Sequence, residues 1–529
     1  MKFLKIILPL VALITIPVLC FHLLHYTGSN PFQLSTSIMK EVIEQTLKIS
    51  IPVALIVGLL LFPFIRQQER YQHVSGPEML CGRSAIKHAS HALKTDNGVR
   101  GIKVHPKIVL KKQDECGNFF VFGMQGAGKS TIIKYWLNQL IQRTIPILIY
   151  DEKREYTELF YDESIVLLSP GDKRSVIWDL SADINDISSA RTFSEAIIHQ
   201  TSNEPFWSDS ARLIVTGALM CLIRKEMPWG WKELHNLLFK DAKALQKELG
   251  LFFPEAALFA DPENKTSASV LAVVSSQLSW VRYLSEVQCS NAKTFSFKNW
   301  MNADIAKKVI VQTNPSYRNM SQSLFSAALS MLTNQILALP DCSRREVWLV
   351  LDEIAAIQKN DSIEVWLSRC RSKGARTIAG TQSVSQLQSI YGDKDSETIL
   401  SLFSTVIALR VGAAGHSAGI ASQAMGRRRV IITSTSIDSS KKKSVTYSEQ
   451  EIPVVTAEQL IHVPRPDKKG VTGFLAISGT NAVYELKWPY PELPKIALGF
   501  EPEPIEMEEK LSINVAKSKV TTNPFIRGS

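Results

Sequence analysis

Cysteine is scarce and scattered in this 529-residue chain. Its seven cysteines form no C-x-x-C pair and have no histidines at the spacing of a zinc site. This pattern excludes the common zinc-binding motifs and indicates no disulfide framework. Internal repeats are also absent. Such cysteine usage fits a reducing compartment, which is also where ATP is available.

Charge and apolar content indicate the broad class of the protein. Lysine and arginine number 60 against 50 aspartate and glutamate residues, which gives a formal net charge of +10 and a pI near 9.1. Apolar residues make up 45% and charged residues 21% of the chain, which is ordinary for folded domains and excludes extensive disorder. The length allows two or three domains. The basic excess predicts an anionic partner, either nucleic acid or an acidic membrane face.

A glycine-rich octapeptide carries the clearest functional signal. Residues 123–130 read GMQGAGKS and satisfy the pattern G-x-x-x-x-G-K-[ST] of a nucleotide phosphate loop. An apolar run at 118–122 precedes the loop and an amphipathic run at 131–141 follows it, which predicts a strand, a loop and a crossover helix. We expect the phosphates to contact Gly123, Gly126, Ala127, Gly128, Lys129, Ser130 and Thr131.

Each residue type in this loop has a chemical reason. The glycines permit positive φ and a close approach of main-chain N–H groups to the phosphates. Lys129 reaches the terminal phosphates as a point charge, and the Ser130 hydroxyl is placed to ligate Mg²⁺. The helix that begins near Thr131 adds the positive end of its dipole. A glycine turn without a ligand is the alternative interpretation.

A second motif, VWLVLDE at 347–353, is the expected partner of the phosphate loop. An apolar strand that ends in Asp352 brings a carboxylate to the carboxyl edge of the sheet, where it can hold Mg²⁺. Glu353 is the candidate that orients and polarises the attacking water. A buried strand that ends in a solvated acidic turn is the alternative.

Polar residues beyond the next apolar strand extend this site. Thr381 and Gln382, in AGTQS, are candidates to sense the γ-phosphate, although a polar strand end explains them nearly as well. Arg371 and Arg376 lie just upstream, and either could neutralise transition-state charge in a neighbouring subunit. A surface arginine is the alternative for each.

The N-terminus predicts a membrane anchor. Residues 3–24 and 49–65 are two almost wholly apolar runs near the length that a spanning helix needs. A cleaved signal peptide is the alternative for the first run, but no small-x-small cleavage site follows it. Lys2, Lys5, Arg66 and Arg70 place both outer ends in the cytoplasm, so residues 26–48 would form a short periplasmic loop.

Past the anchor, the pattern predicts an α/β domain interrupted by helices. Apolar strand-like runs, typical of a parallel sheet covered on both faces, occur at 118–122, 145–150, 164–168, 308–313, 347–351, 376–380 and 405–411. Helix-like segments take over at 188–200, 208–226, 231–239, 241–249 and 266–286. We therefore expect an anchor at 1–70, a nucleotide-binding domain at 71–181 and 302–494, an inserted all-α domain at 182–301 and a mobile polar tail at 495–529.

Six blocks of sequence occur in a specific order. They are GMQGAGKST at 123, YDEKREYTELFYDESIVLLSPGDKRSVIWDL at 150, EPFWSDSAR at 204, KTSASVLAVVSSQLSWVRYL at 265, VWLVLDE at 347 and AGTQSVSQLQSIYG at 379. Together they resemble the type IV secretion coupling proteins, the TraD/TraG family of conjugative DNA-transfer ATPases, and most closely its TraD branch. The resemblance extends over nearly the whole chain, including the anchor.

The resemblance implies a hexameric RecA-like motor of the bacterial inner membrane that uses ATP and Mg²⁺. Such a motor has a helical DNA-associated domain in the cytoplasm, receives a relaxase-bound single strand and feeds it to the secretion channel. The residues carried over to matching motif positions are Lys129, Ser130, Asp352, Glu353 and Gln382. Arg371 corresponds to an arginine that acts in trans, with Arg369 and Arg376 as competitors, and Asp151 to an acidic residue near the nucleotide.

Two features qualify the resemblance. TraD-like proteins often carry a long tail that docks the relaxosome, whereas this chain has only residues 495–529 after the predicted domain. The basic excess predicts a channel that holds a phosphate backbone without reading sequence. Solvated loops are the alternative for the basic clusters, and a packing anchor is the alternative for the aromatic pair. The candidate contacts are Arg427, Arg428, Arg429, Lys441, Lys442, Lys443, Lys468, Lys469, Phe206 and Trp207.

Two functional hypotheses follow from the sequence. The first is an ATP-driven translocase of DNA and nucleoprotein. The second is a receptor or scaffold of the secretion machine, in which the nucleotide gates docking without pumping the strand. Both use the same phosphate loop, so the motifs do not separate them. A chromosome-partitioning pump is disfavoured because the chain shows neither a multi-helix anchor nor a long linker.

Overall fold

The computed structural model describes residues 71–94, 99–200, 204–288, 293–302, 308–342, 344–437 and 443–502, with Glu44, Thr46 and Lys48. The predicted spanning segments at 3–24 and 49–65 lie outside these residues. Within the described part, one helix, α8 (Pro205–Arg224), is long and apolar enough to cross a membrane, but 67% of its apolar stretch is buried inside the protein. This burial is typical of a core helix.

The chain divides into two compact units. One contains residues 1–74 and 429–450, and the other contains residues 75–428 and 451–529. A three-stranded sheet with the order β1-β14-β15 lies mostly in the first unit. Its strands have the bounds Tyr71–Ser75, Arg427–Ile437 and Lys443–Pro453. The arginines at 427–429 therefore lie in a strand, whereas the sequence predicts a loop.

The larger unit is built on a ten-stranded sheet with the order β2-β17-β16-β13-β5-β12-β11-β6-β10-β7. The seven strands predicted from apolar runs all occur, and they pair in parallel with one another. Their bounds are Phe119–Phe122 (β5), Ile147–Asp151 (β6), Val166–Leu168 (β7), Lys308–Gln312 (β10), Val347–Leu351 (β11), Ala375–Thr381 (β12) and Thr405–Ala408 (β13).

Three further strands, which the sequence reading missed, extend one side of the sheet. β16 (Val471–Ile477) pairs antiparallel with β13, β17 (Ala482–Trp488) pairs antiparallel with β16, and β2 (Glu78–Cys81) pairs parallel with β17. An antiparallel hairpin at the edge of a parallel sheet is common in such folds. Here it brings the start of β16 next to the phosphate loop.

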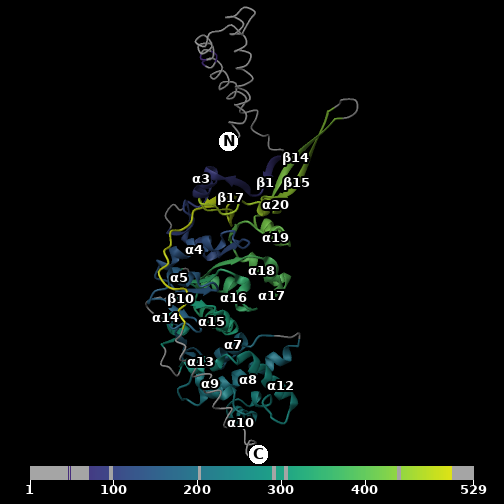
Figure 1. Cartoon of the computed structure of the whole chain (residues 1–529). Coiled ribbons are helices and arrows are strands. Elements are labelled where there is room, and N and C mark those ends of the chain that lie inside the picture. Colours follow the sequence, from purple (N-terminus) through teal and green to yellow (C-terminus); the bar gives the residue numbers. More distant parts are fainter. Residues whose placement is uncertain are drawn as a thin grey trace, which may run out of the picture. The chain divides into compact units, whose positions relative to one another are not determined.

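Helices cover both faces of the sheet, as Figure 1 shows. Alternate residues of β5 face opposite cores: Phe119 and Val121 join one cluster, and Phe120 and Phe122 join the other. The first cluster lies under α3 (Gly82–Ala92), α4 (Lys129–Ile141), α5 (Glu155–Phe160) and the β3–β4 hairpin (Arg100–His105 and Ile108–Lys111). The second lies under α15 (Arg318–Leu337), α16 (Ser362–Ser368), α17 (Val384–Tyr391) and α18 (Asp393–Ser401).

A helical segment shares the second core with the sheet. Besides α8, its helices are α6 (Leu180–Asp183), α7 (Ile187–Ile197), α9 (Trp231–Leu238), α10 (Ala242–Phe252), α11 (Pro254–Ala257), α12 (Lys265–Leu278), α13 (Val281–Gln288) and α14 (Phe297–Asn302). The single helix expected at 266–286 is wrong, because α12 ends at Leu278 and α13 begins at Val281. The domain bounds of 182–301 stay a prediction.

The two ends of this helical segment are tied together at its base. β8 (Ile177–Trp178) pairs in parallel with β9 (Thr294–Phe295). The buried Asp183 carboxylate accepts hydrogen bonds from the Trp178 indole, the Ser296 hydroxyl and the main-chain N–H of Phe297, at 2.6, 2.6 and 2.8 Å. One carboxylate thus joins the chain that enters the segment to the chain that leaves it.

The start of the predicted mobile tail is ordered. Residues 495–502 run as an extended segment against α5, the end of β10 and the loop after β7, with main-chain hydrogen bonds to Glu158, Gln312 and Asp172. The expected mobility is therefore incorrect for these residues, because specific bonds offset their polarity. Residues 503–529 lie outside the described part.

Candidate functional site

The phosphate loop lies at the carboxyl edge of the sheet, between the ends of β12 and β13. The main-chain N–H of Gly123 donates to Thr381 O at 3.2 Å, and that of Met124 donates to Arg410 O at 2.9 Å. Gly126 and Gly128 have φ values of +75° and +97°. A Cβ on Gly128 would lie 2.5 Å from Val471 Cγ2, so this position requires glycine for both its backbone and its packing.

Lys129 opens α4 and turns toward the end of β11. Its side chain is 5% exposed, and its Nζ donates to Glu353 Oε2 at 2.7 Å and to the main-chain oxygen of Asp352 at 2.5 Å. Gly380 on β12 makes room for this lysine, since a Cβ there would lie 2.7 Å from Lys129 Cδ. The fold thus brings the two predicted motifs into direct contact.

Ser130 and Asp352 also meet as expected. The Ser130 hydroxyl lies 3.2 and 3.3 Å from the two carboxylate oxygens of Asp352, which is 5% exposed. The Lys153 ammonium, in the loop after β6, lies 3.7 Å from Asp352 Oδ2. Within the described ranges, no group of three or more His, Cys, Asp or Glu side chains gathers to hold a metal. One hydroxyl and one carboxylate fit Mg²⁺, which usually takes its remaining ligands from water and phosphate.

Glu353 is held on both of its oxygens. Oε1 accepts from the Thr381 hydroxyl at 2.9 Å, while Oε2 accepts from Lys129 and from the main-chain N–H of Gln382 at 3.0 Å. The residue is 7% exposed. These contacts fix a carboxylate beside the phosphate loop, where a general base or water-orienting group is needed. The role of the Gln382 side chain stays a prediction.

Neighbouring ionisable groups respond to this concentration of negative charge. Burial, followed by repulsion from Glu353, raises the pKa of Glu152. The pKa of the fully buried Tyr156 is raised well above its usual value by burial and then by the charge of Asp352. Such perturbation of several groups at one edge is typical of functional sites.

Asp151 is completely buried at the end of β6. Its Oδ2 accepts from the main-chain N–H and the hydroxyl of Thr157, both at 2.8 Å, at the start of α5. Burial raises its pKa to about 6, and its Oδ1 has no hydrogen-bond partner. This buried carboxylate orders the turn into α5, and its predicted place near the nucleotide stays a prediction.

The three candidate arginines separate into two groups. Arg376 is 3% exposed and donates to Arg345 O at 3.0 Å, so it belongs to the interior and is not available to a neighbour. Arg369 and Arg371 are exposed and precede β12. Because the phosphate loop follows a parallel strand, these two arginines lie at the opposite edge of the sheet from the loop of their own chain.

The aromatic candidates lie at the start of α8 in the helical segment, whereas Lys468 and Lys469 precede β16, whose first residue, Val471, packs against Gly128 of the phosphate loop. Trp207 packs partly buried against the core and donates through its indole to Glu204 Oε2 at 3.1 Å, which is the role of a packing anchor. Phe206 is 47% exposed. Lys468 and Lys469 are exposed in the turn before β16. Lys441 and Lys442 lie outside the described residues.

Two residues of the site were missed or only half recognised from sequence. Lys153 follows β6 in a run of charged residues, EKRE, which gives no local sign of a partner across the sheet. Gly380 follows an alanine within an apolar strand, and only its distance to Lys129 explains it. The roles of both residues become visible only in the folded chain, where they contact segments that are distant in sequence.

Three comparisons with known proteins all find similarity to coupling proteins of conjugation or type IV secretion. A family model described as the type IV secretion-system coupling protein DNA-binding domain matches residues 103–487. The coupling protein TraD of Escherichia coli strain K12 is 25% identical over 494 residues, covering 88% of this chain. The aligned region spans 66% of that relative, just under two thirds of its length.

Solved structures of a conjugative coupling protein, TrwB, share the fold. The unbound form superposes with a TM-score of 0.70 at 18% identity and covers 81% of this chain and 96% of TrwB. TrwB in complex with ADP and Mg²⁺ gives a TM-score of 0.68 at 18% identity, covering 82% of this chain and 98% of TrwB. At this identity the likeness concerns the fold.

Proposed function

This chain belongs to the type IV secretion-system coupling proteins, and from that premise we propose that it is an inner-membrane ATPase. It couples a relaxase-bound DNA strand to a secretion channel and drives the transfer by ATP hydrolysis. The observation that carries the proposal is the contact of Lys129 with Glu353 and of Ser130 with Asp352, at 2.7 and 3.2 Å. These contacts unite both halves of a P-loop ATPase.

The residues present fit ATP and Mg²⁺. Positive φ at Gly126 and Gly128 leaves a turn open to phosphate oxygens at the start of α4, and Ser130 and Asp352 offer two hard oxygen ligands. The related TrwB has been solved with ADP and Mg²⁺ and with a non-hydrolysable ATP analogue. Bound Mg-ATP would supply the phosphoryl group, and the metal would neutralise the charge that develops on the ADP leaving group.

The chain's own groups then have separate tasks. Lys129 exchanges its contact with Glu353 for the terminal phosphates, which leaves Glu353 Oε2 with one acceptor position open beside the Gln382 N–H. Glu353 orients water for in-line attack and accepts its proton, while Thr381 and the Gln382 main chain keep its other contacts. The Gln382 side chain senses the γ-phosphate. In a homo-hexamer, Arg371 acts in trans on the neighbouring site, because it faces away from the phosphate loop of its own chain.

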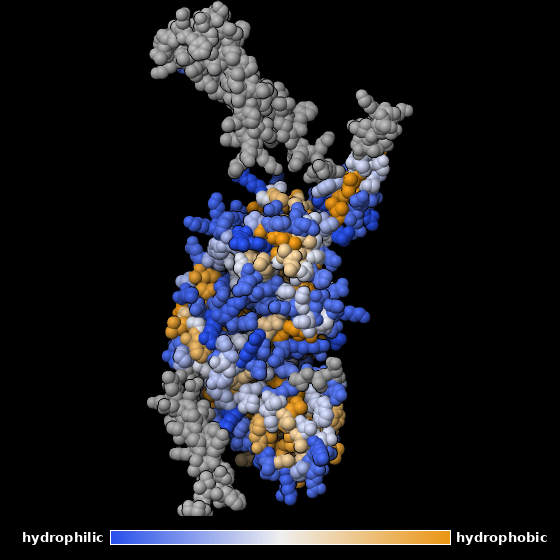
Figure 2. Space-filling model, turned by 45° about the vertical axis from the view of Figure 1, so that its right-hand side comes forward, coloured by the Kyte–Doolittle hydropathy of each residue, from blue (hydrophilic) through white to orange (hydrophobic). Residues whose placement is uncertain are grey.

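The distribution of charge indicates which part of the chain contacts the DNA strand. Residues 182–301 carry 12 lysine and arginine against 13 aspartate and glutamate residues, whereas residues 302–494 carry 22 against 17. Figure 2 shows hydrophilic residues over much of the visible surface, with apolar patches at the helical end, along one side of the nucleotide-binding part and near the top. Backbone neutralisation needs basic residues, so we place the strand along the nucleotide-binding part, with Lys468 and Lys469 among its contacts.

The setting follows the family. Two retained helices at 3–24 and 49–65 anchor the chain in the bacterial inner membrane as a multi-pass protein, with the ATPase in the cytoplasm. Its other partners are the relaxosome and the secretion channel. The alternative is a nucleotide-gated receptor that docks the substrate without pumping it, for which the shared phosphate loop is equally suited.

One experiment tests the motor. ATP hydrolysis by the full-length chain is measured with single-stranded DNA, duplex DNA and no DNA, alongside conjugative transfer in cells. We expect single-stranded DNA to stimulate hydrolysis. Lys129→Ala should abolish nucleotide binding, and Glu353→Gln should preserve binding but lower kcat by about 10²-fold or more. Transfer that persists in Glu353→Gln, which binds nucleotide without hydrolysing it, but is lost in Lys129→Ala would favour the nucleotide-gated receptor. Hydrolysis indifferent to DNA would refute the motor.

A further inference from the structure

An ordered strap, residues 495–502, crosses the carboxyl ends of β6, β10 and β7. The main-chain N–H of Ile496 donates to Glu158 O at 2.9 Å, and the Gln312 side chain donates to Gly499 O at 2.7 Å. Farther along, the N–H of Glu501 donates to Asp172 Oδ2 at 3.1 Å. In Figure 1 the strap belongs to the yellow chain that passes α5 and β10. It is therefore a docked segment with bonds along its length.

The strap packs against the loop between β6 and α5. The Arg154 guanidinium lies 4.1 Å from the centre of the Phe500 ring, a cation–π contact. Arg154 has a φ of 65°, a left-handed conformation that is unfavourable for a residue with a Cβ and persists where its surroundings impose it. A Cβ on Gly499 would lie 3.2 Å from Arg154 Cβ, so glycine allows the strap to approach this closely.

The residue before Arg154 reaches the nucleotide site. Lys153 places its ammonium 3.7 Å from Asp352 Oδ2, and Asp352 also accepts from Ser130. A cation at this distance stabilises the carboxylate and opposes a second cation there. Phe500, Arg154, Lys153 and Asp352 thus form a continuous chain of contacts from the strap to the proposed metal ligand.

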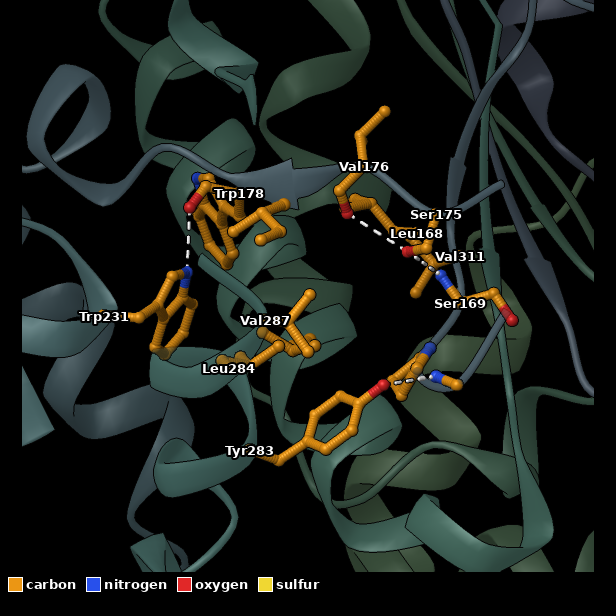
Figure 3. Close-up of a pocket in the computed structure, with 14 residues that line it drawn as sticks. Leu168, Ser169, Ser175, Val176, Trp178, Trp231, Tyr283, Leu284, Val287 and Val311 are labelled. Atoms are coloured by element: carbon orange, nitrogen blue, oxygen red, sulfur yellow. Dashed lines mark hydrogen bonds between the residues drawn. The ribbon is translucent and has the colours of Figure 1, made fainter. Parts of the chain in front are cut away.

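The other end of the strap holds the junction with the helical segment. Arg174 donates to Leu498 O at 2.8 Å and pairs with Asp172 at 2.7 Å. On the far side of the same loop, the Gly171 N–H donates to the Tyr283 hydroxyl of α13 at 3.0 Å. Figure 3 shows this junction, with Tyr283, Leu284 and Val287 of α13 facing Leu168 and Val311 across an apolar crevice of about 30 Å³.

We propose that the strap is a latch on the nucleotide site, an inference that rests on the proposed ATPase function. While docked, it fixes the loop at 152–154 so that Lys153 lies beside Asp352 and opposes Mg²⁺. Release of Phe500 lets Arg154 leave its left-handed conformation and moves Lys153 away, which favours loading of the metal. Lys153 is a positioning residue in this scheme. By linkage, nucleotide with Mg²⁺ loosens the strap to the same extent.

The test uses the full-length chain in detergent. The dissociation constant for Mg²⁺ is measured by titration in the presence of the non-hydrolysable ATP analogue ADPNP. The proteins compared are the parent chain, Phe500→Ala, Lys153→Ala and the double variant. We expect each single change to tighten Mg²⁺ about two- to fivefold, the range of an exposed ion pair, and the double variant to match the single ones. Leu498→Ala is the matched control, because this strap side chain is 66% exposed and only its main chain is bonded.

A second measurement needs no nucleotide. Amide hydrogen exchange at residues 152–158 should quicken in Phe500→Ala and stay unchanged in Leu498→Ala. The latch is overturned if Phe500→Ala lowers Tm but leaves both Mg²⁺ affinity and exchange unchanged, or if the two substitutions act additively. Failure of the parent chain to bind ADPNP would instead refute the ATPase proposal, and exchange would then decide whether the strap holds the loop.

Discussion

Thr381 offers a sharp test of how the site holds Glu353. The residue is 1% exposed, and its hydroxyl lies 2.9 Å from Glu353 Oε1. We predict that Thr381→Val lowers kcat for ATP hydrolysis and leaves the affinity for ATP nearly unchanged, because Thr381 contacts the proposed base and no part of the phosphate loop through its side chain. Valine keeps the shape and removes the hydrogen bond.

The magnitude follows from the contacts. A hydrogen bond to a charged group contributes about 1.5–3 kcal/mol. The lower end applies, because the single hydroxyl proton also has Ser383 O within reach at 3.1 Å, and Glu353 keeps the Gln382 N–H. If poorer orientation of Glu353 raises the activation free energy by about 1.4 kcal/mol, kcat falls about tenfold.

The assay separates binding from chemistry. Single-turnover hydrolysis gives the chemical step, titration with a fluorescent nucleotide gives the affinity, and Tm reports folding. Thr381→Ser is the matched control, since it keeps the hydroxyl and should retain most of the rate. Equal losses in the serine and valine variants, or a valine variant as fast as the parent, would refute the assignment of Thr381 to Glu353.

Three other predictions concern stability and the loop. Gly128→Ala should abolish nucleotide binding and cost about 2 kcal/mol or more, since φ is +97° and the added Cβ would lie 2.5 Å from Val471 Cγ2. Gly126→Ala, with open space around it, should cost less. Glu115→Gln should lower the free energy of unfolding by about 3 kcal/mol in denaturant titrations, because the fully buried carboxylate pairs with Arg143 at 2.8 Å. Burial lowers the pKa of His199 to about 4, so unfolding binds a proton and stability should fall from pH 6.5 toward 4. His199→Gln should flatten this dependence, and an unchanged profile would contradict it.

The comparison of sequence with structure shows which features are local. Strand and loop patterns are local, so the apolar runs around Phe119 and Val347 predicted the parallel strands, and GMQGAGKS predicted the phosphate loop. The hairpin of β16 and β17 was missed because nothing in its sequence showed that it joins a parallel sheet by antiparallel pairing. The helix expected at 266–286 was interrupted near Ser279 for reasons that its periodicity did not reveal.

Residue roles divide in the same way. The sequence by itself determined the identities that ATP chemistry needs: Lys129, Ser130, Asp352 and Glu353 stand in motifs whose meaning lies in adjacent residues. Tertiary structure alone decided which groups meet across the sheet. Strand order brought Lys129 to Glu353.

The same distinction explains why the structure revised the predictions for some residues. Burial removed Arg376 from the trans candidates and turned Asp151 toward Thr157. The strap that contains Phe500 makes bonds that its polar composition did not indicate. Hydrophobic periodicity is a property of neighbouring residues, whereas desolvation and pairing depend on the whole chain, so only the fold assigns them.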